Sequence, residues 1–220
     1  MNDTVVIVTG ASPLDPRAVA SVPFGSIVIA ADGGLDHARA AGLHPAGLIG
    51  DLDSISPEGL AWATEHATIQ RHPAGKDLTD TELAVAFAAD MHPGRLVLLA
   101  GSGPGDRLDH QLAAIGALGA PVLTSVPIVE AWWGCQYLRV LHGPGRAKLD
   151  VDVGENISLL ALHGRCTGVV VSGTEWELDR VELAPLVGRG VSNVARSSRV
   201  DLAVSTGVLT VFVGPREVVP

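Results

Sequence analysis

The sequence predicts an N-terminal α/β domain built on a parallel sheet, followed by an antiparallel β-sandwich domain. Up to about residue 130, short apolar runs alternate with stretches of helical periodicity. Beyond that point the runs are short, turn residues separate them at intervals of about ten residues, and no convincing helix remains. The boundary is expected between about 130 and 145, which gives domains of residues 1–135 and 136–220.

The individual elements follow from these patterns. The first strands are almost continuously apolar, as in Val5-Val6-Ile7-Val8, which is typical of a Rossmann-like parallel sheet covered on both faces. Strands are expected at 5–8, 26–31, 46–49, 68–71 and 95–100, and helices at 35–41, 80–91 and 108–118. In the second domain, strands are expected at 140–141, 148–153, 156–162, 167–171, 175–178, 200–204 and 208–213.

Composition narrows the class of protein. Of 220 residues, 47% are hydrophobic and 18% are charged, which indicates an ordinary folded protein. A net charge of −9 argues against a nucleic-acid or membrane-surface partner. The two cysteines, Cys135 and Cys166, lack metal-site spacing and are expected to be reduced. With neither a signal peptide nor an apolar run of about 18 residues, we expect a cytoplasmic protein.

Two carboxylates follow the third strand. Asp51 and Asp53 come directly after Gly50, and in an extended chain they would point to the same side, about 6.5 Å apart. Two convergent carboxylates repel each other unless a cation lies between them. Oxygen ligands of this kind suit Mg²⁺ bound together with substrate phosphates. An acidic turn without a metal is the alternative for this motif alone.

A second acidic group lies downstream. Thr79 and Glu82 have the spacing of a capping box and predict a helix that starts near Asp80. Asp77 flanks that start, and Lys76, one of only two lysines in the chain, precedes it. Helix N-termini attract phosphates. Together the two groups indicate metal-binding carboxylates and a cation around a polyphosphate.

Further polar residues follow other strands of the same sheet. Asp32 and Gly33 follow the second strand, and a glycine-rich loop (Gly101, Gly103, Gly105) follows the fifth. Ligands of open α/β sheets bind beyond the carboxyl ends of the strands. Arg107 could contact a phosphate. Asp109 and His110 are adjacent near a helix start, where neighbours point apart, which favours a substrate or nucleotide contact over a catalytic dyad.

Several other sites are disfavoured by missing motifs. The turn after the first strand, Thr9-Gly10, lacks the later glycines of a dinucleotide-binding fingerprint. The glycine-rich loop lacks the P-loop pattern, and no nucleophile elbow is present. Taken alone, Trp176 between two glutamates indicates a core or interface residue, and Ser192-Asn193 an ordinary turn.

Taken in order, these motifs resemble those of the thiamine pyrophosphokinase (thiamine diphosphokinase) family over nearly the whole chain. The similarity lies in residues 31–34, 50–54, 76–80, 107–110, 156–159 and 190–193. Leu52, where the family often has an aromatic residue, and Val194, where an acidic residue often follows Ser-Asn, depart from the pattern.

The resemblance implies an ATP- and Mg²⁺-binding α/β domain, and a β-sandwich that contributes to thiamine binding and dimerisation. It implies a homodimer with active sites between subunits, and transfer of a diphosphoryl group from ATP to thiamine. By motif match, Asp51, Asp53 and Asp80 would hold Mg²⁺, with Lys76 and Asp77 beside the phosphates. The nucleotide would contact Asp32, Gly33, Gly101, Arg107, Asp109 and His110, and thiamine would contact Trp176, Ser192 and Asn193.

Two alternatives remain open at the level of the sequence. An acidic pair after a strand also resembles the nucleophile motif of Mg²⁺-dependent phosphatases of the haloacid-dehalogenase type. That motif prefers Thr or Val at position 55, where this chain has Ile55, and it leaves the β domain unused. The other alternative is a protein that binds thiamine or a nucleotide without turnover.

Overall fold

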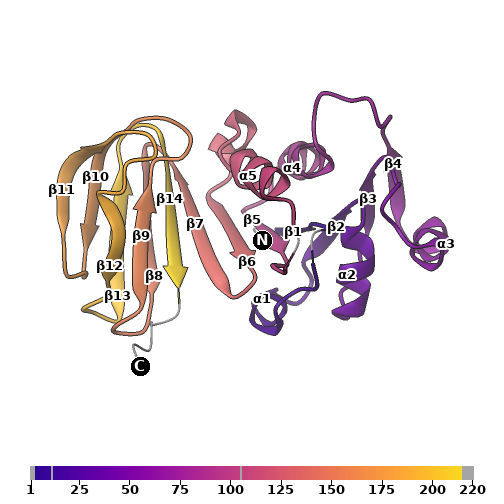
Figure 1. The fold of residues 1–220 in the computed structure, drawn as a ribbon, viewed down its shortest axis with the longest axis horizontal. Coiled ribbons are helices and arrows are strands. Elements are labelled where there is room, and N and C mark those ends of the chain that lie inside the picture. Colours follow the sequence, from indigo (N-terminus) through magenta and orange to yellow (C-terminus); the bar gives the residue numbers. More distant parts are fainter. Residues whose placement is uncertain (1–2, 11, 105, 215–220) are drawn as a thin grey trace. The chain divides into compact units, whose positions relative to one another are not determined.

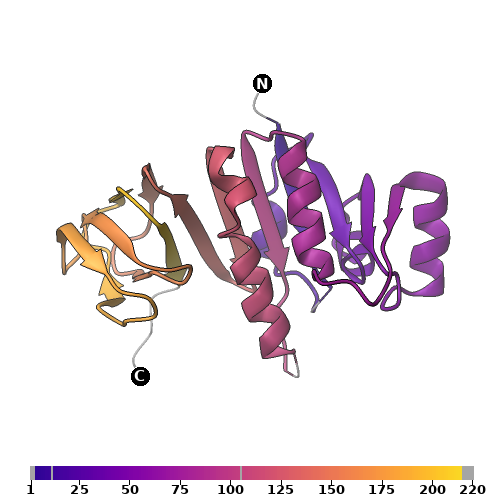
Figure 2. The ribbon, with the colours of Figure 1, turned by 90° about the horizontal axis from the view of Figure 1, so that it is seen from above.

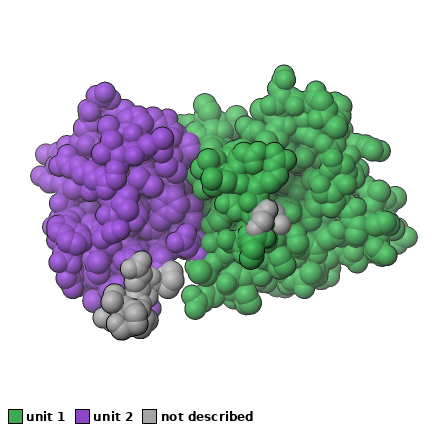
Figure 3. All heavy atoms as spheres, viewed as in Figure 1, with its two compact units in different colours: residues 1–135 green, residues 136–220 purple. Residues whose placement is uncertain are grey.

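A computed structural model of the chain describes residues 3–10, 12–104 and 106–214. It comprises two compact units, residues 1–135 and 136–220 (Figure 3). Gly105 of the glycine-rich loop lies outside the described residues.

The first unit contains a parallel sheet of strand order β6-β5-β1-β2-β3-β4 (Figure 1). Its central strands are apolar on both faces and fully buried, which is why the sequence shows continuous apolar runs there. The strands are β1 (Thr4–Val8), β2 (Ile27–Ala31), β3 (Gly47–Gly50), β4 (Thr68–Arg71), β5 (Arg95–Ala100) and β6 (Ile128–Trp133).

Helices cover both faces of this sheet. Helices α4 and α5 lie on one face and α2 on the other (Figures 1 and 2). The helices are α1 (Pro16–Ala20), α2 (Gly34–Ala40), α3 (Pro57–His66), α4 (Asp80–Asp90), α5 (Leu108–Ala117) and the 3-10 helix η1 (Pro121–Ser125).

The order of the strands creates a switch point. The chain runs outward from β1 to β4, returns through α4 to β5 on the other side of β1, and then continues to β6. Where the direction of winding reverses, between β1 and β5, the loops after adjacent strands diverge and leave a crevice for a ligand.

The second unit is a sandwich of two antiparallel sheets, β12-β9-β14-β7 and β11-β10-β13-β8. Its core combines residues of both sheets, among them Leu159 and Val211 from one and Val169 and Leu202 from the other. The strands are β7 (Gln136–His142), β8 (Gly145–Asp150), β9 (Asn156–Leu160), β10 (Cys166–Ser172), β11 (Leu178–Leu183), β12 (Gly190–Val194), β13 (Arg199–Val204) and β14 (Val208–Gly214). The expected fold class, α/β followed by a β-sandwich, is confirmed.

Local differences from the expected elements have identifiable causes. Helix α3 was not expected, although Ser56 caps it and Pro57 occupies its first turn, which are recognised start signals. Residues 175–177 form no strand, and β11 begins at Leu178. The alternation Glu-Trp-Glu resembles a strand, but the backbone of Trp176 bonds to a side chain instead of to a neighbouring strand. Ser192-Asn193 lies within β12 and not in a turn.

Both cysteines are free, as expected; Cys166 is buried and Cys135 is exposed. Within the described ranges, every helix is too short or too polar to cross a lipid bilayer.

Candidate active site

A cavity of about 610 Å³ lies in the first unit beyond the carboxyl ends of β1, β2 and β3. Nine of the residues singled out from the sequence line it: Asp32, Gly33, Asp51, Asp53, Lys76, Asp77, Asp80, Arg107 and His110. The other lining residues that carry a polar side-chain group were not anticipated as site residues: Thr9, Ser54, Thr79, Thr81, Asp106, Gln111 and Trp133.

Three carboxylates converge on one wall of this cavity. Oxygens of Asp32, Asp51 and Asp80 all lie within 4.8 Å of one another. The pairing of β2 with β3 sets Ala31 opposite Ile49, so Asp32 and Asp51 leave the sheet at neighbouring strand ends. Asp80 comes from elsewhere in the chain, at the first residue of α4. The three side chains meet only through the tertiary structure.

Gly50 allows this convergence. Its φ is +153°, and a Cβ at this position would lie 3.0 Å from both Cβ of Asp32 and Oδ1 of Asp80. Contacts of that length force the neighbouring atoms to move, so any larger residue would push the carboxylates apart.

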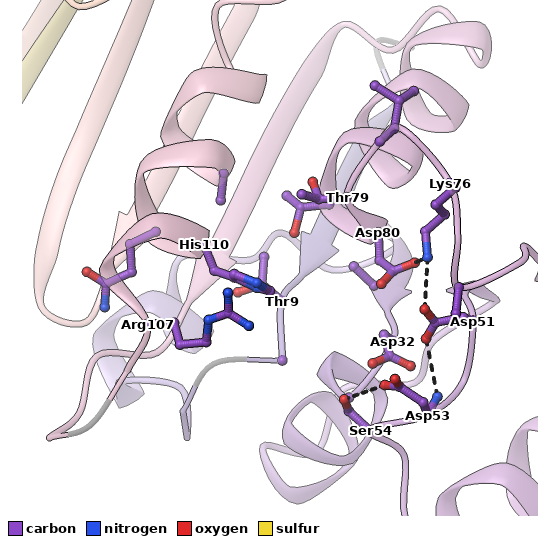
Figure 4. A pocket seen from close by; sticks show the side chains of 18 of the residues that line it. Thr9, Asp32, Asp51, Asp53, Ser54, Lys76, Thr79, Asp80, Arg107 and His110 are labelled. Atoms are coloured by element: carbon purple, nitrogen blue, oxygen red, sulfur yellow. Dashed lines mark hydrogen bonds and ion pairs between the residues drawn. The ribbon is translucent and has the colours of Figure 1, made fainter.

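Asp53 is placed differently from what an extended chain would give. Leu52 has a φ of +70°, so the backbone turns between the two aspartates. Asp53 accepts a hydrogen bond from Ser54 Oγ (2.8 Å), and its backbone N–H donates to Asp51 Oδ1 (3.4 Å). Asp53 lines the cavity beside the three carboxylates but is not one of them (Figure 4). Its role as a metal ligand stays a prediction.

Asp32 joins the cluster, although the family resemblance implied only a nucleotide contact for it. Its side chain is 9% exposed, and Oδ1 has no hydrogen-bond partner among the described residues. Burial raises the pKa of Asp32, and the negative charges of Asp80 and Asp53 add to this effect. Asp32 follows β2, which pairs with β3, and this position at the end of a neighbouring strand could have indicated that it belongs to the cluster.

Lys76 stands between two of the carboxylates. Its Nζ lies 3.0 Å from Asp51 Oδ2 and 2.9 Å from Asp80 Oδ1, and its side chain is 12% exposed. Burial lowers the pKa of Lys76, but the hydrogen bonds to Asp80 and Asp51 outweigh burial and raise it overall. The hydrogen bond from Lys76 is also the main reason why the pKa of Asp51 is lowered. Lys76 is therefore a protonated counter-ion for the acidic cluster.

The start of α4 forms the neighbouring wall. The predicted capping box is present: Thr79 Oγ1 accepts from the Glu82 amide (3.2 Å), and Glu82 Oε2 accepts from the Thr79 amide (2.8 Å). This holds the first turn rigidly, with Asp80 and Thr81 facing the cavity. The positive end of an 11-residue helix thus lies at the site.

Arg107 and His110 lie across the cavity from the acidic cluster (Figure 4). Asp109 is exposed and binds Arg107 through two hydrogen bonds of 3.2 and 2.6 Å. This pair lowers the pKa of Asp109 to about 2. The carboxylate of Asp109 therefore binds Arg107. His110 lines the cavity, and the Asp109 carboxylate does not orient its imidazole.

The glycine-rich loop is held by Asp106. Its carboxylate accepts from Ser12 Oγ (2.7 Å) and from the Gly103 amide (2.8 Å). Gly101 is buried against the Ser12 carbonyl, where a Cβ would lie 2.0 Å from that oxygen. Gly101 therefore allows two loops to approach each other and does not line the cavity.

The three residues expected to contact thiamine lie in the second unit. Trp176 is 58% exposed, so it is not a core residue. Ser192 is exposed and has a φ of +61°, whereas Asn193 is only 4% exposed. Trp176 and Asn193 are joined by hydrogen bonds.

Comparisons with solved structures show the same fold over almost the whole chain. Thiamine pyrophosphokinase from Bacillus subtilis superposes with a TM-score of 0.81 and 22% identity, covering 96% of this chain and 99% of that one. A thiamin pyrophosphokinase family protein from Enterococcus faecalis gives a TM-score of 0.78 at 20% identity, covering 98% of this chain and 100% of that one. Thiamin pyrophosphokinase from Candida albicans gives a TM-score of 0.76 at 13% identity, covering 96% of this chain and 90% of that one.

A comparison with curated proteins finds no match by sequence. Residues 24–129 match the family model described as thiamin pyrophosphokinase, catalytic domain. This range contains every cavity-lining residue of the acidic cluster together with Lys76, Arg107 and His110. The resemblance seen in the motifs is thus confirmed: residues 24–129 are similar to the catalytic domain of thiamin pyrophosphokinases, and solved thiamin pyrophosphokinases have the same fold.

Proposed function

We propose that this protein is a thiamine diphosphokinase, which transfers the diphosphoryl group of ATP to the hydroxyethyl oxygen of thiamine and releases AMP. The observation that carries the proposal is the convergence of three carboxylates and Lys76 on one cavity within the segment that matches the family. In this reaction the thiamine oxygen bonds to the β-phosphorus, and the bond between that phosphorus and the oxygen that bridges it to the α-phosphorus breaks. This oxygen leaves with AMP, and the hydroxyl proton passes to solvent.

The acidic cluster fits a divalent cation. Asp32, Asp51 and Asp80 supply only oxygen donors, and the buried Oδ1 of Asp32 has no partner among the described residues. Hard oxygen donors at this spacing suit Mg²⁺, completed by phosphate oxygens and water. When bound there, Mg²⁺ would neutralise the negative charge of the polyphosphate. Asp53 adds a fourth carboxylate at the edge of the cluster.

The residues around the cluster position the phosphates. Lys76 can turn from the carboxylates to a phosphate oxygen once a metal replaces it as their counter-ion. Arg107, whose side chain is 67% exposed, can exchange Asp109 for a phosphate. The start of α4, beside Asp77, offers a positive helix end to the same group. Each of these contacts stabilises the charge that develops on the leaving AMP or the transferred group.

The acceptor is expected to contact the second unit. An exposed indole such as that of Trp176 suits the cationic thiazolium ring of thiamine. Ser192, the other exposed residue that the motifs single out in this unit, lies on β12. We propose a homodimer in which these residues serve an active site shared between subunits, and a cytoplasmic enzyme that uses ATP and Mg²⁺.

The test is incubation of the protein with ATP, Mg²⁺ and thiamine, followed by chromatography. Equimolar AMP and thiamine diphosphate, both absent when thiamine or Mg²⁺ is omitted, are expected. Inorganic phosphate released without thiamine would indicate a phosphatase instead. Binding of thiamine without any product would indicate a protein that binds and does not turn over. Either of these two results would refute the proposed function.

A further inference from the structure

We infer that Asn193 is a positioning residue that holds the exposed indole of Trp176 in place for its ligand. The identity of that ligand, thiamine, rests on the proposed function, whereas the connection between Asn193 and Trp176 is a property of the second unit alone. The family resemblance implied a direct substrate contact for Asn193, and the geometry points to a different role.

The side chain of Asn193 is fully occupied within the protein. Its Oδ1 accepts from the amides of Trp176 (3.0 Å) and Val194 (2.9 Å). Its Nδ2 donates to the Trp176 carbonyl (2.7 Å) and to Thr174 Oγ1 (3.0 Å). An asparagine side chain has two acceptor sites and two donor hydrogens, so all four are used. Because it is also only 4% exposed, it has nothing left to offer a ligand.

Two of these bonds grip the backbone of Trp176 at both of its polar groups, N–H and C=O. A neighbouring strand would normally make such a pair of bonds. Asn193 thus replaces a strand partner for one residue, at the point where 175–177 leave the sheet. The backbone is held while the residue as a whole remains 58% exposed.

The conformation of Ser192 turns Asn193 inward. Its φ of +61° is rare for a residue with a side chain, and it coincides with a register shift in the pairing of β12 with β9. The Ser192 amide donates to Ser158 Oγ (3.0 Å) on β9, which stabilises this irregular turn of the strand. Backbone strain of this kind persists where the surrounding structure requires it, often next to a ligand site.

Further polar groups of residues 175 and 177 are also bonded within the unit. The Glu175 amide donates to the Val194 carbonyl (2.8 Å), and its carboxylate pairs with Arg196. Glu177 Oε1 accepts from the Gly173 amide (2.8 Å). The segment that carries Trp176 is therefore anchored on both sides of the indole. A rigid aromatic side chain binds more tightly because less ordering entropy is lost on binding.

The test measures the motion of the indole and the affinity for thiamine separately. The chain has four tryptophans, so four indole N–H signals are expected in a ¹⁵N NMR spectrum, and the loss of one in Trp176→Phe assigns it. In wild type, the heteronuclear NOE of that signal should match those of the other three indoles, which belong to partly buried residues. In Asn193→Ala and Asn193→Asp it should fall clearly, whereas Thr206→Val, which removes a threonine pair elsewhere in the same unit, should not change it.

Affinity is measured by calorimetry with thiamine alone on wild type, Asn193→Ala, Trp176→Ala and the double variant. Immobilising one side chain costs about 0.5–1.5 kcal/mol, so Asn193→Ala should weaken binding about two- to twelvefold. In the Trp176→Ala background the same change should have no further effect, because Asn193 acts through Trp176. The KM for thiamine should rise in parallel, while kcat and the KM for ATP change less than twofold.

Other outcomes overturn the inference. An unchanged indole NOE in Asn193→Ala would do so, as would an equal loss of affinity with and without Trp176, which would indicate a direct contact. If Asn193→Ala does not fold, the milder Thr174→Val, which removes one of the four partners, takes its place with the same expected direction. Absence of thiamine binding to wild type would refute the proposed function but not this inference, because the NOE measurement needs no ligand.

Discussion

Replacing Asp32 by asparagine should stabilise the metal-free protein and abolish its response to magnesium. The Asp32 carboxylate is buried, and its oxygens lie within 4.8 Å of those of Asp51 and Asp80. Two unit charges at that separation repel by about 1 kcal/mol at the dielectric constant of water and by about 3.5 kcal/mol at an effective value near 20. Asparagine has nearly the same shape without the charge, and its amide can donate to a neighbouring carboxylate.

The expected gain in the free energy of unfolding for Asp32→Asn is at the lower end of this range. Lys76 already offsets part of the repulsion through its ion pairs with Asp51 and Asp80. We therefore expect at least about 1 kcal/mol, which raises Tm by about 2–4 °C in a chain of this length. The assay is thermal unfolding measured by scanning calorimetry, first in EDTA and then at several magnesium concentrations. Wild type should gain Tm as magnesium increases, and Asp32→Asn should not.

The pH dependence gives the sign of the same effect. Burial raises the pKa of Asp32, so its folded form holds a proton at pH values where the unfolded chain has lost it. The penalty for the charge is absent below the ordinary pKa of 3.8, grows as the pH rises, and is complete above the raised pKa. The advantage of Asp32→Asn should therefore be largest at neutral pH and disappear toward pH 3.8.

The matched control is Asp90→Asn, an exposed carboxylate at the last residue of α4. It should change neither Tm in EDTA nor the response to magnesium. A lower Tm for Asp32→Asn in EDTA, or a magnesium response equal to that of wild type, would refute the reasoning that Asp32 is a strained member of the metal cluster.

Three further predictions concern other groups. Lys76→Met should lower Tm in EDTA, because two carboxylates lose their counter-ion, and reduce turnover by about 10²–10³-fold; a neutral effect on both would show that Lys76 is dispensable. Thr79→Ala should reduce the free energy of unfolding by about 1 kcal/mol in urea titration through loss of the capping box, and an unchanged midpoint would contradict this. Iodoacetamide should label exposed Cys135 quickly and Cys166 only after unfolding, because burial raises the pKa of the Cys166 thiol; mass spectrometry after brief labelling distinguishes the two.

Local features of the sequence predicted much of the first unit correctly. The apolar run at residues 5–8 is a buried central strand, and the helix beginning at Asp80 has the capping box that its spacing indicated. Both depend on residues within a few positions of one another, since hydrophobic periodicity and capping are short-range effects. The family resemblance depended on the order of short motifs, which is likewise visible in the chain itself.

Periodicity was misleading where one side chain overrides the backbone pattern. Residues 175–177 alternate like a strand, yet Asn193, remote in sequence, takes the hydrogen bonds that a strand neighbour would make. The spacing of Asp51 and Asp53 indicated two parallel side chains, but the positive φ of Leu52 turns the backbone between them. Neither effect is contained in the alternation of polar and apolar residues.

By itself, the sequence determined the fold class, the positions of most strands and helices, the family resemblance, and the set of polar residues that follow the strand ends. The tertiary structure alone decided that Asp32 joins Asp51 and Asp80, that Lys76 pairs with two of them, and that Asn193 bonds to the backbone of Trp176. The reason is physical: periodicity, capping and turn preferences depend on near neighbours. By contrast, the meeting of side chains depends on strand register, backbone dihedrals and close approaches between segments far apart in the chain.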